Sequence, residues 1–327
     1  MILWTSSEIK APLNGAPPSN ELSSRHKQRK GIQKGGGSSN RELGKGFCVT
    51  SGHAGCMRRL SILLILGAAV SSIHCAGPAQ RPAAVLPPPK HGDVYVVAHR
   101  GARDGIPENT LAAYETAIGM GVDFVEVDLR TTRDGHIVSV HNKEIDSYAT
   151  DGTRGLVSEM TLEQLKRVNI GSRIGPQWSN ERIPTFEEIL KLCKGRVGIY
   201  LDLKDASVEK LVSIVREWDM AGQVLWYAGF DALQRLARLC PECILMPDPG
   251  PQENLPKIIE CFRPSVIAAV WRYYSPAFAE KCHQAGAIVI VDESGPDCWQ
   301  DALAWKSDGI QTDHPAELIA LLELRGR

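Results

Sequence analysis

The sequence predicts an α/β fold, a (β/α)₈ TIM barrel with one small insertion, from three observations. Short runs rich in β-branched residues recur along the chain after about residue 92. Stretches with helical patterns separate most of these runs, which is typical of parallel strands covered by helices. There are eight such runs, and eight units in one domain favour a closed barrel. The expected strands are 94–98, 124–129, 197–203, 223–228, 243–246, 265–271, 287–291 and 309–312.

A doubly wound open sheet is the alternative fold. Such a sheet usually carries a GxGxxG phosphate fingerprint after its first strand, whereas this chain has HRGARDGIPENT at 99–110. The span of about 142–183 contains no expected strand and is too long for an ordinary barrel loop. We therefore expect a barrel with an insertion after the hairpin of the second strand, lying over the C-terminal ends of the strands.

The N-terminal region differs in composition from the rest of the chain. Residues 1–56 are rich in Gly, Ser, Lys and Arg, so we expect them to be disordered or to lie upstream of a true start at Met57. In residues 57–75, two arginines precede an apolar stretch, the pattern of a secretory signal peptide. An Ala/Pro-rich linker at 76–92 then leads to the barrel at 93–327.

The signal segment leaves two modes of export open. Its end, SSIHC, resembles the lipobox of bacterial lipoproteins, in which the cysteine is lipidated. His74 departs from the small residue expected before Cys75. A membrane tether through Cys75 and plain secretion are therefore both retained, and either one predicts a periplasmic, membrane-anchored or secreted protein.

Composition excludes several classes of partner. The 37 basic and 38 acidic side chains nearly cancel, so the chain lacks the broad positive field that nucleic-acid binding needs. Cys240 and Cys243 have CxxC spacing, but no second pair stands at zinc-site spacing, so buried or disulfide-bonded cysteines are expected. The sequence does not determine an oligomeric state.

Polar residues stand where three of the expected strands end. In a barrel these ends meet around one pocket, and residues at i and i+2 of a strand share a face. Carboxylates gathered there repel one another unless a cation neutralises them, and oxygen ligands suit Mg²⁺ or Ca²⁺. The candidates are His99 and Arg100 on the first strand, Glu126 and Asp128 on the second, and Asp202 and Lys204 on the third.

A hairpin brings a second histidine toward this group. Asp134-Gly135 is a strong two-residue turn signal within 130–142. With that loop Asp128 lies opposite His141, which predicts that both side chains face the pocket. Two histidines to move protons, cationic side chains and a metal would meet the needs of phosphodiester hydrolysis.

Five blocks resemble the glycerophosphodiester phosphodiesterase family. They are HRGARDGIPENT, EVDLRTTRDGHIVSVHN, GSRIGPQWSNERIPTFEEIL, LDLK and GIQTDHP, and the resemblance covers nearly all of 94–320. It implies a phospholipase C-like phosphodiesterase barrel that hydrolyses glycerophosphodiesters to glycerol 3-phosphate and an alcohol through a cyclic phosphate. The implied roles are acid/base catalysis for His99 and His141, phosphate binding for Arg100 and Lys204, and metal binding for Glu126, Asp128 and Asp202.

Departures from the family pattern keep other functions open. Asp202 stands where the family usually has Glu, Asn142 where it usually has Asp, and an aromatic residue is missing near Ile290. One alternative is a lysophospholipase D-like or sphingomyelinase D-like enzyme on the same barrel. Another is a non-catalytic barrel that binds phosphodiesters. Asn109 is expected to be structural. Asp313 is expected to be either a site-rim residue or a loop cap.

Overall fold

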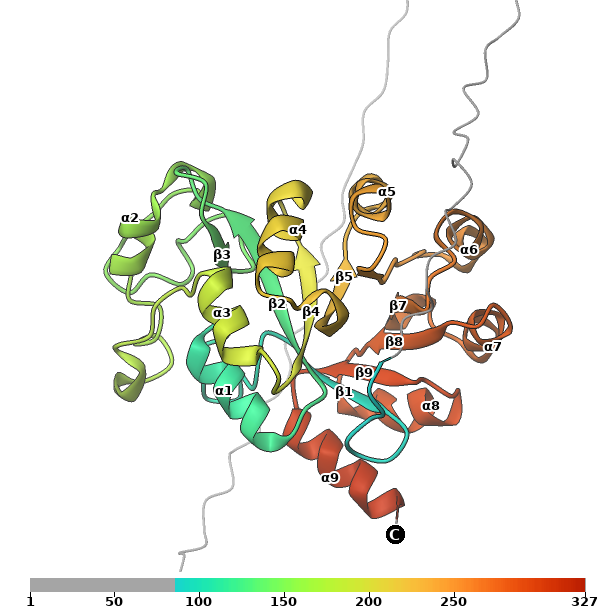
Figure 1. The fold of residues 1–327 in the computed structure, drawn as a ribbon. Helices are drawn as coiled ribbons and strands as arrows, with labels where there is room; N and C mark the ends of the chain where they lie inside the picture. The colour runs from blue at the N-terminus through green and yellow to red at the C-terminus, as the bar shows by residue number, and fades with distance from the viewer. Residues whose placement is uncertain (1–85, 327) are drawn as a thin grey trace, which may run out of the picture. The chain divides into compact units, whose positions relative to one another are not determined.

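The computed structural model describes residues 86–326, in which eight parallel strands curve into a nearly closed barrel with helices outside it (Figure 1). The expected extension at 1–56, the signal segment at 57–75 and most of the linker at 76–92 lie outside the described residues. All eight expected strands are confirmed. They are β1 (Tyr95–Ala98), β2 (Phe124–Thr131), β4 (Gly198–Leu203), β5 (Val224–Tyr227), β6 (Ile244–Leu245), β7 (Val266–Val270), β8 (Ile288–Asp292) and β9 (Gly309–Thr312).

The barrel is least tightly joined between β6 and β7. Hydrogen-bonded neighbours follow the order β6, β5, β4, β2, β1, β9, β8 and β7. β2 and β4 pair over six residues, but β5 and β6 pair over two. Between the two ends of the order, the nitrogen of Ala268 donates a hydrogen bond of 3.0 Å to the carbonyl of Pro247. The ends therefore meet through the residue that follows β6 by two positions.

The covering helices begin at residues whose side chains cap them. The Thr110 side chain accepts from the nitrogen of Ala113, and the Thr185 side chain accepts from that of Glu188, which satisfies backbone donors at the helix starts. No helix within residues 86–326 is long and apolar enough to cross a bilayer. The helices are α1 (Leu111–Met120), α3 (Phe186–Cys193), α4 (Val208–Glu217), α5 (Phe230–Leu239), α6 (Leu255–Phe262), α7 (Pro276–Gln284), α8 (Trp299–Ala304) and α9 (Pro315–Arg325).

Side chains that alternate along the strands form two apolar clusters, one on each face of the sheet, and this alternation also sets which face the polar residues occupy. In β2, Val125, Val127 and Leu129 belong to the cluster that packs against the helices. Phe124 belongs to the cluster inside the barrel. Because side chains alternate along a strand, Glu126 and Asp128 also face the interior, nearer its C-terminal end. The hydrophobic pattern of β2 thus fixes where its two carboxylates point.

The expected hairpin after β2 forms with β3 (Ile137–Ser139), but its register differs from the prediction by one residue. Thr131 lies opposite Ile137. The nitrogen of Val140 donates to the carbonyl of Asp128 at 3.0 Å. Asp128 therefore lies beside Val140 and not opposite His141, and the predicted register is wrong.

The error comes from the length of the turn. The nitrogen of Thr132 donates to the carbonyl of His136, and the Thr132 hydroxyl accepts from the nitrogen of His136, which leaves a loop of three residues instead of two. Gly135 has a φ of 82°, the left-handed conformation that closes three-residue hairpin loops. The Thr132 hydroxyl also donates to Asp134, so a side chain outside the Asp-Gly signal selects the longer turn.

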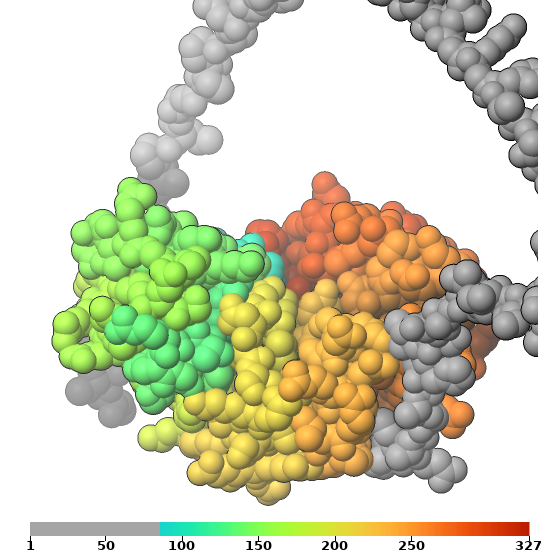
Figure 2. Space-filling model, turned by 90° about the horizontal axis from the view of Figure 1, so that it is seen from above, coloured from blue at the N-terminus to red at the C-terminus, as the bar shows by residue number. Residues whose placement is uncertain are grey.

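The expected insertion is present and has its own apolar cluster. It contains α2 (Leu162–Arg167) and the short helical turns η1 (Val157–Glu159) and η2 (Pro176–Trp178). In Figure 2 this segment, coloured green, stands at one side of the molecule. The buried residues of this cluster come from the insertion and from the hairpin before it, and they are Val138, Val140, Ile145, Tyr148, Val157, Leu165, Val168, Ile170 and Ile183.

The CxxC pair forms a disulfide. Cys240 and Cys243 are buried and joined, with their Cα atoms 5.3 Å apart. This confirms the expectation of disulfide-bonded or buried cysteines over a zinc site. Cys193, Cys282 and Cys298 are buried free thiols.

Candidate active site

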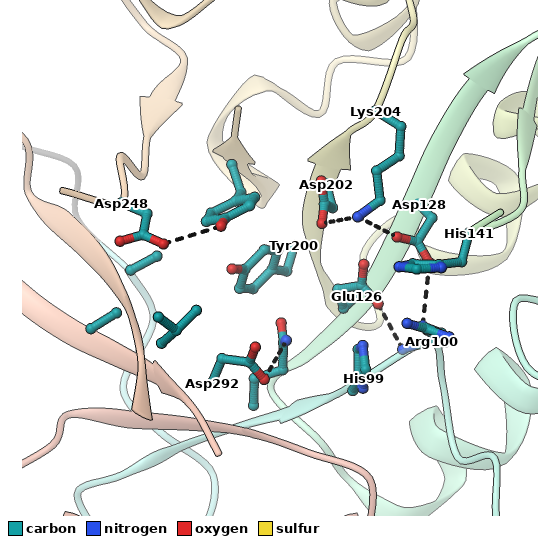
Figure 3. A pocket seen from close by; sticks show the side chains of 15 residues that line it. His99, Arg100, Glu126, Asp128, His141, Tyr200, Asp202, Lys204, Asp248 and Asp292 are labelled. Carbon is teal, nitrogen blue, oxygen red and sulfur yellow. Dashed lines mark hydrogen bonds and ion pairs between the residues drawn. The ribbon is translucent and has the colours of Figure 1, made fainter. Parts of the chain in front are cut away.

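A cavity of about 320 Å³ lies at the C-terminal ends of the strands. The structure brings all seven sequence-predicted site residues to its wall, and Figure 3 shows them converging from β1, β2, β4 and the segment after β3. They are His99, Arg100, Glu126, Asp128, His141, Asp202 and Lys204.

Three carboxylates form one cluster in this pocket. One oxygen each of Glu126, Asp128 and Asp202 lies within 4.8 Å of the others. The pairing of Asp128 with Asp202 across β2 and β4 places these two at the same level of the barrel. Glu126 is 2% and Asp128 1% exposed. Convergent buried oxygen donors of this kind fit a hard divalent cation such as Mg²⁺ or Ca²⁺.

Electrostatics of the cluster agree with that fit. Burial raises the pKa of Glu126 well above its usual value, and repulsion from Asp128 and Asp202 raises it further. Burial also raises the pKa of Asp202, in spite of the neighbouring Lys204. Burial alone would raise the pKa of Asp128, but Lys204 and a hydrogen bond from Asn109 outweigh it and lower the pKa. Two of the three carboxylates therefore lack sufficient positive charge nearby.

Lys204 lies between two of the carboxylates. Its Nζ is 2.6 Å from Asp202 Oδ2 and 3.0 Å from Asp128 Oδ1. The prediction that Lys204 reaches the pocket is met, and within the described residues its ion-pair partners are these carboxylates. The shorter Asp202 still reaches the cluster, because it stands directly beside Asp128 in the sheet.

Arg100 stands in a turn just after β1, where its backbone adopts the left-handed conformation. Its φ is 59°, and its backbone nitrogen donates to Glu126 Oε2 at 2.8 Å. Its Nη1 donates to Glu108 at 3.1 Å, and its Nε lies 3.5 Å from Asp128 Oδ2 without a hydrogen-bond partner. Glu108 therefore lies next to the site and orients the guanidinium.

The following glycine makes this turn possible. Gly101 has a φ of 83°, and a Cβ added there would lie 2.8 Å from the Cβ of Ala113 in α1. Only a residue without a side chain allows the strand end to approach the helix this closely. The HRG motif thus supplies a histidine, an arginine that can donate hydrogen bonds to a phosphate, and the turn that places both side chains at the pocket.

His99 has a carboxylate partner. Its Nδ1 is 2.6 Å from Oδ1 of Asp313, which follows β9 and also pairs with Arg103. Burial alone would raise the pKa of Asp313, but the hydrogen bonds and charges of His99 and Arg103 outweigh it and lower the pKa strongly. Asp313 is therefore a site-rim residue that orients His99, one of the two roles the sequence left open.

His141 has a neutral partner instead. Its Nδ1 is 2.9 Å from Oδ1 of Asn142, whose amide nitrogen donates to Ser147 in the insertion. His141 lines the pocket although the register differs from the prediction, because β3 ends at Ser139 and strand alternation stops before His141. In Figure 3 His99 and His141 lie on two sides of Arg100.

Asn109 orients one of the carboxylates of the site. Its Nδ2 donates to Asp128 Oδ2 at 2.8 Å, and its Oδ1 accepts from the hydroxyls of Tyr114 and Ser139. Thr110, not Asn109, caps α1. Asn109 is structural, as expected, but the structure it stabilises is the orientation of a candidate metal ligand; its φ of 55° is the signal of that constraint.

A second group of polar residues lines the opposite side of the pocket. Sequence reasoning did not identify these as site residues. They are Tyr200, Tyr227, Asp248, Asp292 and Gln311.

Comparison with known proteins agrees with this geometry. Residues 99–224 match the model of the glycerophosphoryl diester phosphodiesterase family. This part of the chain is similar to that family. The match begins at His99 and contains all seven predicted site residues, and it confirms the resemblance that the sequence blocks indicated.

Several relatives of the family align with the same part of the chain. The YhdW protein of Bacillus subtilis is 41% identical over 111 residues, which are 34% of this chain and 45% of that protein. The glycerophosphodiester phosphodiesterase of Caldanaerobacter subterraneus subsp. tengcongensis is 34% identical over 137 residues, 40% of this chain and 56% of the relative. The chain thus matches about half the length of these relatives.

Solved structures of the family share the whole barrel. A glycerophosphodiester phosphodiesterase from Agrobacterium tumefaciens superposes with a TM-score of 0.62 at 24% identity, covering 69% of this chain and 99% of that one. An Oleispira antarctica phosphodiesterase, in complex with the product sn-glycerol-3-phosphate, gives 0.64 at 23% identity, covering 70% and 96%. These likenesses establish the TIM barrel fold.

Proposed function

We propose that this protein is a metal-dependent phosphodiesterase that hydrolyses glycerophosphodiesters to glycerol 3-phosphate and an alcohol. The observation that carries the proposal is the convergence of Glu126, Asp128 and Asp202 within 4.8 Å, in a pocket also lined by His99 and His141. The matched family and the glycerol 3-phosphate complex of the Oleispira antarctica phosphodiesterase support the substrate class.

Each catalytic need has a side chain in the pocket. A divalent cation held by Glu126, Asp128 and Asp202 would polarise the phosphoryl group and stabilise its developing charge. Arg100 supplies an Nε without a hydrogen-bond partner, which is suited to a phosphate oxygen. Lys204 adds a second positive charge beside the same site.

The two histidines would move the protons. In the first step the glycerol 2-hydroxyl attacks phosphorus, its proton passes to one imidazole, and the other imidazole protonates the departing alkoxide as the phosphorus–oxygen bond breaks. Water then opens the cyclic phosphate with the proton roles reversed. We assign the base of the first step to His99, because the Asp313 carboxylate stabilises an imidazolium there, whereas His141 faces a neutral amide.

Turnover of a defined substrate tests the proposal. Purified protein with added Mg²⁺ or Ca²⁺ is expected to release glycerol 3-phosphate from a glycerophosphodiester, and His99→Ala or His141→Ala to lower kcat about 10²- to 10⁴-fold. Equal activity of the wild type and both variants would contradict it. Turnover of lysophosphatidylcholine without turnover of glycerophosphocholine would favour the lysophospholipase D-like alternative, and no turnover of either would favour the binding-only barrel.

The cellular location is a further part of this proposal. The pattern of a signal peptide at 57–75 leads us to propose export, with or without a lipid tether at Cys75. The Cys240–Cys243 disulfide supports an oxidising compartment. N-terminal sequencing and mass spectrometry of the native protein test this, and peptides from residues 1–56 in the mature protein would contradict it.

A further inference from the structure

One side of the pocket is not used by the proposed phosphate chemistry. It is formed where β5, β6, β8 and β9 end, and we call Asp248, Asp292 and Gln311 the acceptor half. In Figure 3 Asp248 and Asp292 lie across the pocket from Asp128, Lys204 and His141. This half is continuous with the phosphate site, so a group bonded to the phosphate can reach it.

Gln311 provides a buried acceptor that lacks a donor. The residue is 6% exposed and lines the pocket. Its Nε2 donates to Asp292 Oδ1 at 3.1 Å, which fixes the orientation of the amide. Its Oε1 is buried and has no hydrogen-bond partner. Buried polar atoms in proteins are nearly always hydrogen-bonded, so this oxygen indicates a ligand that donates hydrogen bonds.

The two carboxylates of this half indicate the charge of that ligand. Asp248 accepts from the Tyr227 hydroxyl at 3.2 Å and from the nitrogen of Gly250 at 2.7 Å. Arg272 acts on Asp248 from a distance, and His99 and Arg100 act on Asp292. Within residues 86–326, neither carboxylate forms an ion pair with a lysine or arginine. Burial raises the pKa of both, as expected of carboxylates that lack a close cation.

Three kinds of alcohol can be compared with these features. A polyol donates hydrogen bonds but brings no charge. A quaternary ammonium brings charge and can stack on Tyr200 and Tyr227, whose ring centroids are 5.6 Å apart, but it donates no hydrogen bond to Gln311. A primary ammonium brings a positive charge and three N–H donors. Only the last satisfies both the carboxylates and the amide oxygen.

We propose that the acceptor half binds the primary ammonium group of the substrate's alcohol, so that the enzyme prefers glycerophosphodiesters of amino alcohols. The ammonium donates to Gln311 Oε1 and lies between the carboxylates of Asp248 and Asp292, while the phosphate lies beside Arg100. This inference rests on the proposed function and names the substrate class of the same pocket.

Three substrates that differ only in the alcohol test the preference. With the same added metal, kcat/KM for glycerophosphoethanolamine is expected to exceed that for glycerophosphoglycerol about tenfold or more, with glycerophosphocholine between them. Equal values for all three, or the highest value for glycerophosphoglycerol or glycerophosphocholine, would overturn the inference and leave the proposed function intact. No turnover of any of the three would overturn the proposed function, and this inference with it.

Variants separate an ammonium site from a site for the glycerol moiety. Asp292→Asn keeps the shape of the side chain and removes its charge, so the ratio of kcat/KM for glycerophosphoethanolamine to that for glycerophosphoglycerol is expected to fall at least about fivefold. Asp248→Asn is expected to lower the same ratio and serves if Asp292→Asn does not fold. Asp231→Asn, the same change on the exposed start of α5, is the matched control. Equal losses on both substrates would place glycerol hydroxyls in the acceptor half and overturn the inference.

Discussion

The two sides of the pocket differ in charge and in how they relate to known proteins. One side, from β1, β2 and β4, carries Arg100 and Lys204 among the converging carboxylates. The acceptor half has no lysine or arginine in the pocket wall. The family match at 99–224 contains the first side and ends in β5, before Asp248. The matched part of the chain thus contains the residues of the proposed phosphate chemistry, and the acceptor half of the proposed substrate preference lies mostly beyond the match.

The sharpest way to break this comparison is to remove one carboxylate from each side. Asp128→Asn removes a candidate metal ligand and the partner of Lys204, so turnover of every glycerophosphodiester is expected to fall about 10³-fold or more. Initial-rate assays measure this, and calorimetric titration with Mg²⁺ and Ca²⁺ is expected to show weaker binding. Asp248→Asn is the comparison, with an expected loss of about tenfold at most on glycerophosphoglycerol. Equal losses of turnover in the two variants would show that the two sides of the pocket do not have separate roles.

A smaller effect is expected when the orientation of His99 is disturbed. Asp313→Asn keeps the size of the residue but removes the carboxylate that accepts from His99, so kcat is expected to fall about 10- to 100-fold with little change in KM. The nitrogen NMR shifts of the His99 ring are expected to report a changed tautomer balance. Asn142→Asp, at the partner of His141, is the matched variant, with an expected change below about threefold. A change in KM alone would contradict a role for Asp313 in proton transfer.

The sequence predicted the side of the pocket from β1, β2 and β4 better than the acceptor half, for a physical reason. Carboxylates at i and i+2 of one strand, such as Glu126 and Asp128, must share a face, so their convergence follows from the strand pattern alone. Asp292 and Gln311 become neighbours only through the pairing of β8 with β9, which local periodicity does not reveal. The hairpin register was wrong because the Thr132 side chain selects a longer turn.

The constraint on the turn after β1 can be tested at Gly101. Gly101→Ala forces a side chain into a left-handed position 2.8 Å from Ala113, so the free energy of unfolding is expected to fall by about 1–3 kcal/mol. Urea unfolding measures the loss. Gly222→Ala is the control, since a Cβ there meets no atom within 4 Å, and its effect is expected to stay within about 0.5 kcal/mol. Equal losses would mean that the HRG turn is not constrained.

The smallest expected effect is the pH dependence contributed by Asp313. Its pKa is lowered in the folded protein, although burial opposes this, because His99 and Arg103 hold its charged form. The stabilisation is therefore present above the unfolded pKa of about 3.9 and is lost as pH falls through the lower folded value. The side chain is 35% exposed, so the contribution is expected to stay below about 1 kcal/mol. Urea unfolding of wild type and Asp313→Asn is expected to differ more at pH 6 than at about pH 3, and the opposite order would contradict the assignment.

The junction between β6 and β7, which we call the seam, has fewer lateral hydrogen bonds than the pairing of β2 with β4, and the acceptor half lies beside it. β2 and β4 are held by six paired residues, whereas β6 is two residues long and the bond from Ala268 to Pro247 links it to β7. Segments with few lateral hydrogen bonds open at lower free-energy cost than fully paired ones. Asp248 follows this seam directly. Residues 247–250 are therefore expected to open locally at a lower free-energy cost than the paired residues of β2 and β4.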